Sequence, residues 1–166
     1  FKLVQGYFGG GKTHFLYCVR ALAWKHGFVT AVVELSPTEC PYDDALRVYQ
    51  AVARRIGARP REVLLAANLG LGDLIRNAVD ERLDEARRSV RERGVPNVEA
   101  EARRQVEDWC GKTLGRAWCE SPSYRQAVTQ LALAYLEGNR VLERQLEAWL
   151  HGEPVPPAEL REAGVY

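Results

Sequence analysis

The sequence contains no methionine, and this absence extends to position 1, where the chain begins with Phe1. The apolar residues Phe1, Leu3 and Val4 form a short stretch that has the pattern of a strand without its beginning. We therefore expect the 166-residue chain to be a fragment of a longer protein.

Cysteine and histidine are also scarce. No two of the four cysteines have CxxC spacing, and the three histidines lie far from one another. These spacings argue against a zinc site and against a disulfide framework, and they are typical of reduced thiols in a cytoplasmic protein.

The chain has no apolar run as long as a membrane span, and no signal peptide opens it. We expect no membrane partner. The net charge of +1 argues against a strongly basic nucleic-acid-binding protein, although a local patch remains compatible with it. An apolar fraction of 46% and a charged fraction of 27% are ordinary for a globular domain of this length.

Residues Gly6–Thr13 read GYFGGGKT, a complete Walker A pattern. A glycine-rich loop of this kind points successive backbone N–H groups at phosphate oxygens, because no Cβ blocks the approach. Lys12 is expected to reach the β- and γ-phosphates, and the Thr13 hydroxyl is expected to bind Mg²⁺. The predicted site for ATP and Mg²⁺ consists of Gly6, Gly9, Gly10, Gly11, Lys12 and Thr13.

The segments around this loop strengthen the prediction. Apolar residues after Thr13 recur at helical spacing until Gly27, a stop signal. Phe28–Leu35 is then a β-branched run of strand length, which suits a buried parallel strand. Residues 1–35 thus have the pattern of strand, phosphate loop, helix and strand. The alternative is a glycine-rich surface turn that binds nothing.

After residue 36 the pattern becomes helical, with start signals at Pro41, Asp73, Asn97, Ser121 and Asn139. The predicted fold class is an α/β P-loop NTPase, truncated so that two strands are visible, with a large all-helical insertion or subdomain. Residues 1–40 would form the N-terminal part of the P-loop core. Residues 41–166 would form a helical subdomain, inserted before a missing Walker B strand.

Hydrolysis of ATP also requires a group that orients the attacking water. Glu34 ends the apolar run and is the predicted catalytic residue. The alternative is a strand-end carboxylate that is solvated or pairs with an arginine, and the sequence by itself favours this alternative.

Two arginine clusters offer contacts to a nucleic-acid backbone. Glutamates interleave the second cluster, which is typical of a solvated helix face, so the first is the better candidate for DNA. The first consists of Arg54, Arg55, Arg59 and Arg61, and the second of Arg87, Arg88, Arg91 and Arg93.

The stretches GYFGGGKTHFL, GFVTAVVELSP and PYDDALRVYQAVARRI, with residues 149–165, resemble the P-loop ATP-binding proteins of bacterial BREX phage-defence systems (BrxD-type). The resemblance spans most of the chain. It implies an AAA-type ATPase core with a helical insertion between the second strand and the Walker B strand, and nucleotide binding at the Walker A residues. In that family a stretch like residues 149–165 leads into the strand that carries the Asp-Glu pair of Walker B, so the resemblance implies that this chain stops before Walker B.

The predicted function is the ATP-binding portion of an AAA-type ATPase in phage defence, which acts on DNA or partner proteins and whose full-length parent forms a homo-oligomer. Two alternatives stay open: a nucleotide-binding scaffold that does not hydrolyse ATP, and a P-loop small-molecule phosphotransferase. Because Walker B is expected beyond residue 166, residues 1–166 are expected to bind nucleotide without hydrolysing ATP by themselves.

Overall fold

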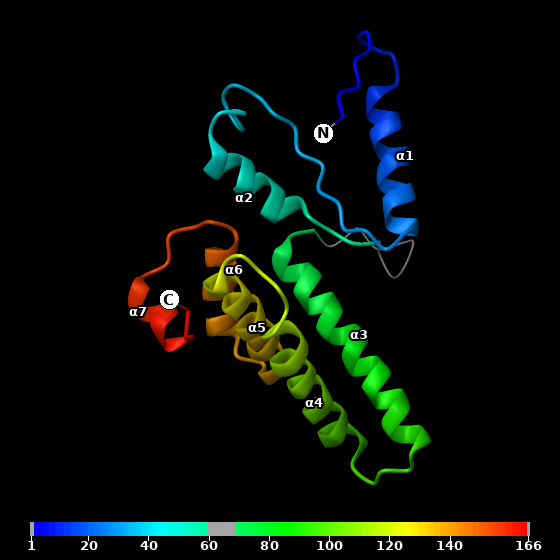
Figure 1. Cartoon of the computed structure of the whole chain (residues 1–166), viewed down its shortest axis with the longest axis vertical. Helices are drawn as coiled ribbons and strands as arrows, with labels where there is room; N and C mark the ends of the chain where they lie inside the picture. The colour runs from blue at the N-terminus through cyan, green and yellow to red at the C-terminus, as the bar shows by residue number, and fades with distance from the viewer. Residues whose placement is uncertain (1, 60–68, 166) are drawn as a thin grey trace.

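The computed structural model describes residues 2–59 and 69–165, and in these ranges the chain is mainly helical. Helices α1 and α2 lie at one end of the molecule and the other helices gather into a bundle (Figure 1). The helices are α1 (Lys12–Lys25), α2 (Ala45–Arg55), α3 (Leu71–Glu92), α4 (Val98–Trp109), the π-helical turn η1 (Cys110–Leu114), α5 (Pro122–Glu137), α6 (Arg140–Leu150) and α7 (Pro157–Glu162).

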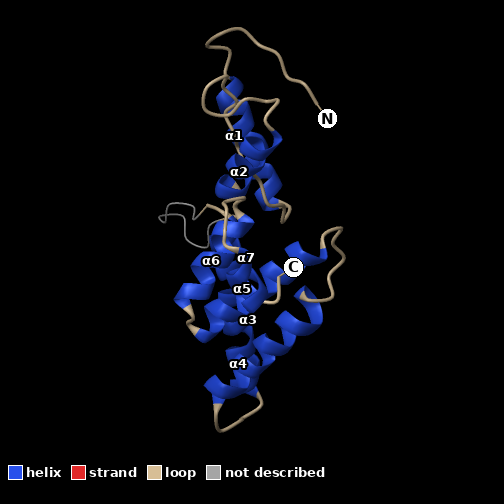
Figure 2. Ribbon diagram, turned by 90° about the vertical axis from the view of Figure 1, so that its left-hand side faces the viewer, coloured by secondary structure: helices blue, strands red, loops and turns tan. Residues whose placement is uncertain are grey.

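The predicted α/β fold class is wrong, because the described residues contain no strand (Figure 2). Pairing in the predicted second strand is limited to Thr30, which exchanges backbone hydrogen bonds of 2.9 and 2.8 Å with Gly57. Residues 2–5 before the loop form no strand either. A β-branched run becomes a strand only when another segment pairs along its length, and no described segment does so here.

Side-chain caps fix where several helices begin. Asp44, Asn97, Ser121 and Asn139 each accept a hydrogen bond from a backbone N–H three residues later. Such a cap satisfies one of the donors that the first helical turn leaves unpaired. Pro122 follows Ser121 at the first position of α5, where its missing N–H costs nothing. The local sequence therefore sets the start of α2, α4, α5 and α6.

The hydrophobic core lies in the bundle, where α3 packs along α4 and α5 packs along α6. Small side chains such as Ala102 and Ala127 are fully buried and allow these helices to approach closely. The largest fully buried side chains are Leu131, Leu146, Leu150, Val79, Val90, Val106 and Cys110. By contrast, none of the residues of α1 is buried.

Helix α2 is fixed to the bundle at the turn that follows α6. The Tyr49 hydroxyl donates to the Leu150 carbonyl at 2.5 Å, and Gln50 donates to the Gly152 carbonyl at 2.8 Å. Gly152 has a φ of +76°, and a Cβ there would lie 3.2 Å from the Tyr49 ring, so both its conformation and its neighbours favour glycine. The predicted domain boundary between residues 40 and 41 stays a prediction.

A charged cluster joins α3 to α6. The Arg76 guanidinium contacts Glu143 at 2.8 Å, Glu147 at 3.0 Å and Asp73 at 2.8 Å. The Glu143 side chain is only 5% exposed, and Arg140 also reaches it at 2.8 Å. The hydrogen bond to Glu147, followed by those to Asp73 and Glu143, raises the pKa of Arg76 despite its partial burial.

Candidate functional site

The loop before α1 has a backbone that only glycine adopts readily. Gly9 and Gly11 have φ angles of +77° and +75°, in the left-handed region where a Cβ is disfavoured. Between them the Gly10 N–H donates to the Tyr7 carbonyl at 3.0 Å, and a Cβ on Gly10 would lie 3.1 Å from that oxygen. Gly9 and Gly11 therefore supply the left-handed backbone angles of this tight turn, and Gly10 leaves room for the Tyr7 carbonyl.

Lys12 closes this turn from the helix side. Its ammonium group donates to the carbonyls of Gly6 at 2.9 Å and Tyr7 at 2.6 Å. A Cβ on Gly6 would lie 3.3 Å from the Lys12 side chain, so the first glycine leaves room for the lysine to lie against the loop. The predicted residues Gly6, Gly9, Gly10, Gly11 and Lys12 are thus brought into one compact loop.

The first turn of α1 is open to an anion. Gly11 precedes α1 without a side-chain cap, and no acidic residue lies in the first turn. The first intrahelical bond runs from the Phe15 N–H to the Gly11 carbonyl, so the N–H groups of Lys12, Thr13 and His14 have no acceptor within the helix. These N–H groups and the helix dipole create a positive potential beside the loop.

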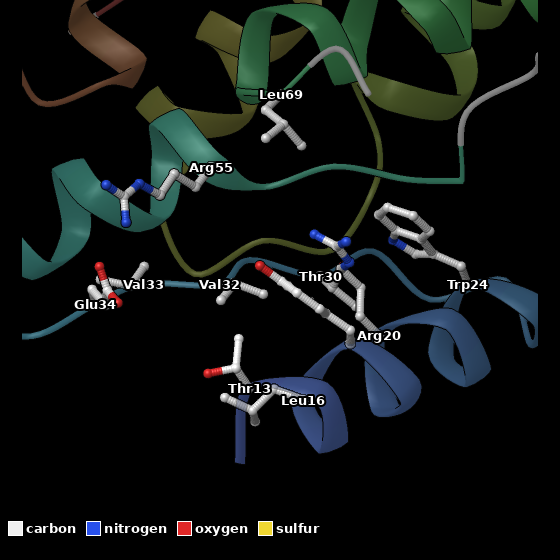
Figure 3. A pocket seen from close by; sticks show the side chains of 11 residues that line it. Thr13, Leu16, Arg20, Trp24, Thr30, Val32, Val33, Glu34, Arg55 and Leu69 are labelled. Carbon is white, nitrogen blue, oxygen red and sulfur yellow. The ribbon is translucent and has the colours of Figure 1, made fainter. Parts of the chain in front are cut away.

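A cleft of about 370 Å³ extends from Thr13 between α1, the segment after it and the end of α2 (Figure 3). On α1 the Arg20 guanidinium lies over the rings of Tyr17 at 4.8 Å and Trp24 at 4.9 Å. The Trp24 indole donates to the Gly57 carbonyl at 3.2 Å, which links α1 to the chain beyond α2. The cleft therefore has an aromatic end along α1 and a polar end near Thr13.

Glu34 lies at the polar end of this cleft. It is exposed, and the described residues include no hydrogen-bond or ion-pair partner for it. It also lines a neighbouring cleft of about 530 Å³ between residues 34–40 and α2. The structure thus brings Glu34 and Thr13 to one cleft, and the catalytic role of Glu34 stays a prediction.

The first arginine cluster is divided between two surfaces. Arg54 forms an ion pair of 2.8 Å with Glu153, whereas Arg55 lines the cleft near Thr13. Arg59 is exposed, and Arg61 lies outside the described residues. Contact of this cluster with DNA stays a prediction.

The second arginine cluster contains an ion-paired member. Arg87 contacts Asp84 at 3.3 Å and Glu99 at 2.7 Å. Its hydrogen bond to Glu99 raises the pKa of the guanidinium and lowers the pKa of that carboxyl. These pairs agree with the interpretation of this cluster as a solvated helix face.

The stacking of Arg20 on the rings of Tyr17 and Trp24 was not among the predicted contacts. Tyr17, Arg20 and Trp24 are spaced three and four residues apart, which places them on one face of a helix. That spacing, with the known attraction of guanidinium for aromatic faces, was the pattern that could have predicted the contact.

Residues 2–59 and 69–165 contain no group of three or more His, Cys, Asp or Glu side chains arranged to hold a metal ion. No helix in the same ranges combines the length and the apolar character that crossing a membrane requires.

Comparison with known protein families matches residues 1–165 to the family described as BREX system ATP-binding protein BrxC/D. Comparisons with curated proteins and with solved structures give no match. The family match covers nearly the whole chain and includes the glycine loop, Lys12 and Thr13. The chain therefore belongs to the BrxC/D family of ATP-binding proteins of the BREX phage-defence system.

Proposed function

We propose that the loop Gly6–Thr13 is the place where this ATP-binding protein holds the phosphates of ATP. The observation that carries the proposal is the loop itself, in which glycines at positive φ precede an uncapped helix start. Backbone N–H groups in such a loop bind phosphate oxygens, and the helix dipole adds to their attraction. Lys12 is already held against the loop and adds a full positive charge.

The same proposal includes a Mg²⁺ ion bound next to the phosphates. Thr13 is exposed at the first turn of α1, and its hydroxyl is an oxygen ligand of the kind that Mg²⁺ binds together with phosphate oxygens and water. Glu34 lines the same cleft without a partner among the described residues and is the candidate for orienting a water molecule.

At the level of the whole protein, the proposed function is that of an AAA-type ATPase that acts on DNA or on partner proteins, with an oligomeric parent. Arg55 and Arg59, which have no carboxylate partner among the described residues, support contact with an acidic partner. All four cysteines are free thiols, which supports the cytoplasm as the compartment.

A nucleotide-binding scaffold is the second candidate. It is favoured by the distribution of the core, since the buried cluster lies in the bundle and α2 joins the bundle to the N-terminal part. In this function ATP would order the loop and α1 and thereby present the bundle to a partner. Turnover of ATP by the protein would decide against it.

The test is a titration of the chain with Mg²⁺ and a fluorescent ATP analogue. Lys12→Ala is expected to weaken binding by at least about 10-fold, because it removes a charged donor worth roughly 1.5–3 kcal/mol. Lys25→Ala is the matched control, since Lys25 lies in the last turn of the same helix. Equal affinity of wild type and Lys12→Ala would exclude the loop as the ATP site.

A further inference from the structure

Arg55 differs from the other arginines of α2 in having no carboxylate partner among the described residues. Arg47 pairs with Asp44 at 3.4 Å, and Arg54 pairs with Glu153 at 2.8 Å. Arg55 instead lines the cleft that begins at Thr13, and it shares the neighbouring cleft along residues 34–40 with Arg47 and Arg54. Its guanidinium therefore lines the same cleft as Thr13, without an ion pair to any described carboxylate.

The register of α2 explains this difference. Successive residues of a helix point about 100° apart, so adjacent arginines face different directions. Ala53 is buried, Arg54 reaches the turn after α6, and Arg55 lines the cleft that α1 also lines. Figure 3 shows Arg55 and Glu34 at the same end of the cleft, with Thr13 across from them on α1.

Arg20, the other guanidinium in the cleft, is placed differently. It is stacked against Tyr17 and Trp24, and it follows Thr13 by seven residues. Seven residues correspond to a rise of about 10 Å along a helix, away from the loop. An anion held at the start of α1 thus has Arg55, rather than Arg20, as the guanidinium at its own end of the cleft.

We propose that Arg55 is a second phosphate-binding residue of the nucleotide site, and that it binds the terminal phosphate of ATP. This inference rests on the proposed function of the loop Gly6–Thr13. A planar guanidinium presents paired donors that match the oxygens of a phosphate, and such charge-assisted hydrogen bonds are among the strong ones in proteins. ADP lacks the terminal phosphate, so Arg55 distinguishes the two nucleotides.

This contact would connect the nucleotide to the bundle. Arg55 is the last residue of α2, and the same helix is held to the turn after α6 through Tyr49 and Gln50. A terminal phosphate bound by both the loop and Arg55 joins α1 to α2. Binding or loss of that phosphate then alters the contact between α2 and the bundle.

The experiment measures the dissociation constants of Mg²⁺-ATP and Mg²⁺-ADP for the 166-residue chain and its variants by calorimetric titration. Arg55→Ala is expected to weaken ATP binding about 10- to 100-fold, the range for loss of a charged hydrogen bond, and to leave ADP binding within about twofold. Arg55→Lys, which keeps the charge, is expected to recover part of the loss. Arg54→Ala, the adjacent residue that faces Glu153, is expected to bind both nucleotides as wild type does.

Equal weakening of ATP and ADP by Arg55→Ala, or no change in either, would overturn the inference, as would an equal loss of ATP binding in Arg54→Ala. Lys12→Ala separates this failure from failure of the loop, because it is expected to weaken both nucleotides. If Lys12→Ala binds both as wild type does, the proposed loop site is wrong. Arg55 is exposed and has no ion pair among the described residues, so the unfolding midpoint of Arg55→Ala should equal that of wild type.

Discussion

Removal of the Arg76 side chain is expected to destabilise the bundle more than removal of any exposed arginine. Arg76 is 23% exposed and pairs with three carboxylates from α3 and α6, of which Glu143 is only 5% exposed. Arg76→Ala leaves Glu143 with Arg140 as its remaining cation, and the Arg140 side chain is 64% exposed. The variant thus leaves a nearly buried carboxylate with a weaker, solvent-screened partner.

Removing one member of a buried ion pair costs about 3–5 kcal/mol of unfolding free energy. Because Arg76 is partly exposed and Arg140 still reaches Glu143, we expect the lower end of that range, about 3 kcal/mol. For a domain of this size the melting temperature should fall by roughly 6–12 °C.

The assay is urea unfolding followed by the helical circular dichroism signal. Arg104→Ala is the control, because Arg104 is 74% exposed and pairs with Glu101 on its own helix, and it should cost less than about 1 kcal/mol. The double variant Arg76→Met, Glu143→Met should recover at least half of the loss, since no buried charge at position 143 is left uncompensated. A loss in Arg76→Ala as small as that in Arg104→Ala would refute the reasoning.

Three further outcomes are expected. Gly9→Ala and Gly94→Ala both place a Cβ at positive φ in open space, so both should lower stability slightly, but Gly9→Ala alone should weaken ATP binding in a titration. Glu34→Gln should bind ATP with an affinity within about twofold of wild type. In any form of the protein that hydrolyses ATP, it should slow turnover by at least about 100-fold, and unchanged turnover would exclude Glu34 from the mechanism. Burial raises the pKa of the Cys110 thiol to about 11, so at pH 8 iodoacetamide should label the exposed Cys18 first and Cys110 only after unfolding, as peptide mass spectrometry would show.

The positions of several helices could be predicted from the sequence because their starts are local features. Asn97 and Ser121 act as caps where the sequence predicted them. Asp73 does not, because α3 begins at Leu71 after Gly70, and Asp73 pairs with Arg76 inside the first turn. An acidic residue within the first turn of a helix has the same local pattern as a cap, so spacing alone does not distinguish the two.

The prediction of a strand at residues 28–35 was wrong because it, too, relied on local sequence alone. Strand formation depends on a partner segment, which a run of β-branched residues does not itself supply. The glycine loop, in contrast, is built within a few residues, so its residues could be named from the sequence. The position of Arg55 opposite Thr13 could not, since it follows from how α2 packs on the bundle.

The lack of any buried residue in α1 implies an uneven stability along the chain. An isolated helix of 14 residues is marginal in water, so α1 is expected to open with a free energy far below that of the bundle. Its backbone amides should exchange with deuterium early, while those of α5 are still protected. Holding α1 in its helical form lowers conformational entropy. When a nucleotide binds the first turn, this loss opposes binding and reduces the net binding free energy. The measured affinity is then lower than the contacts alone would give, and nucleotide should slow exchange in α1 before it changes the melting of the bundle.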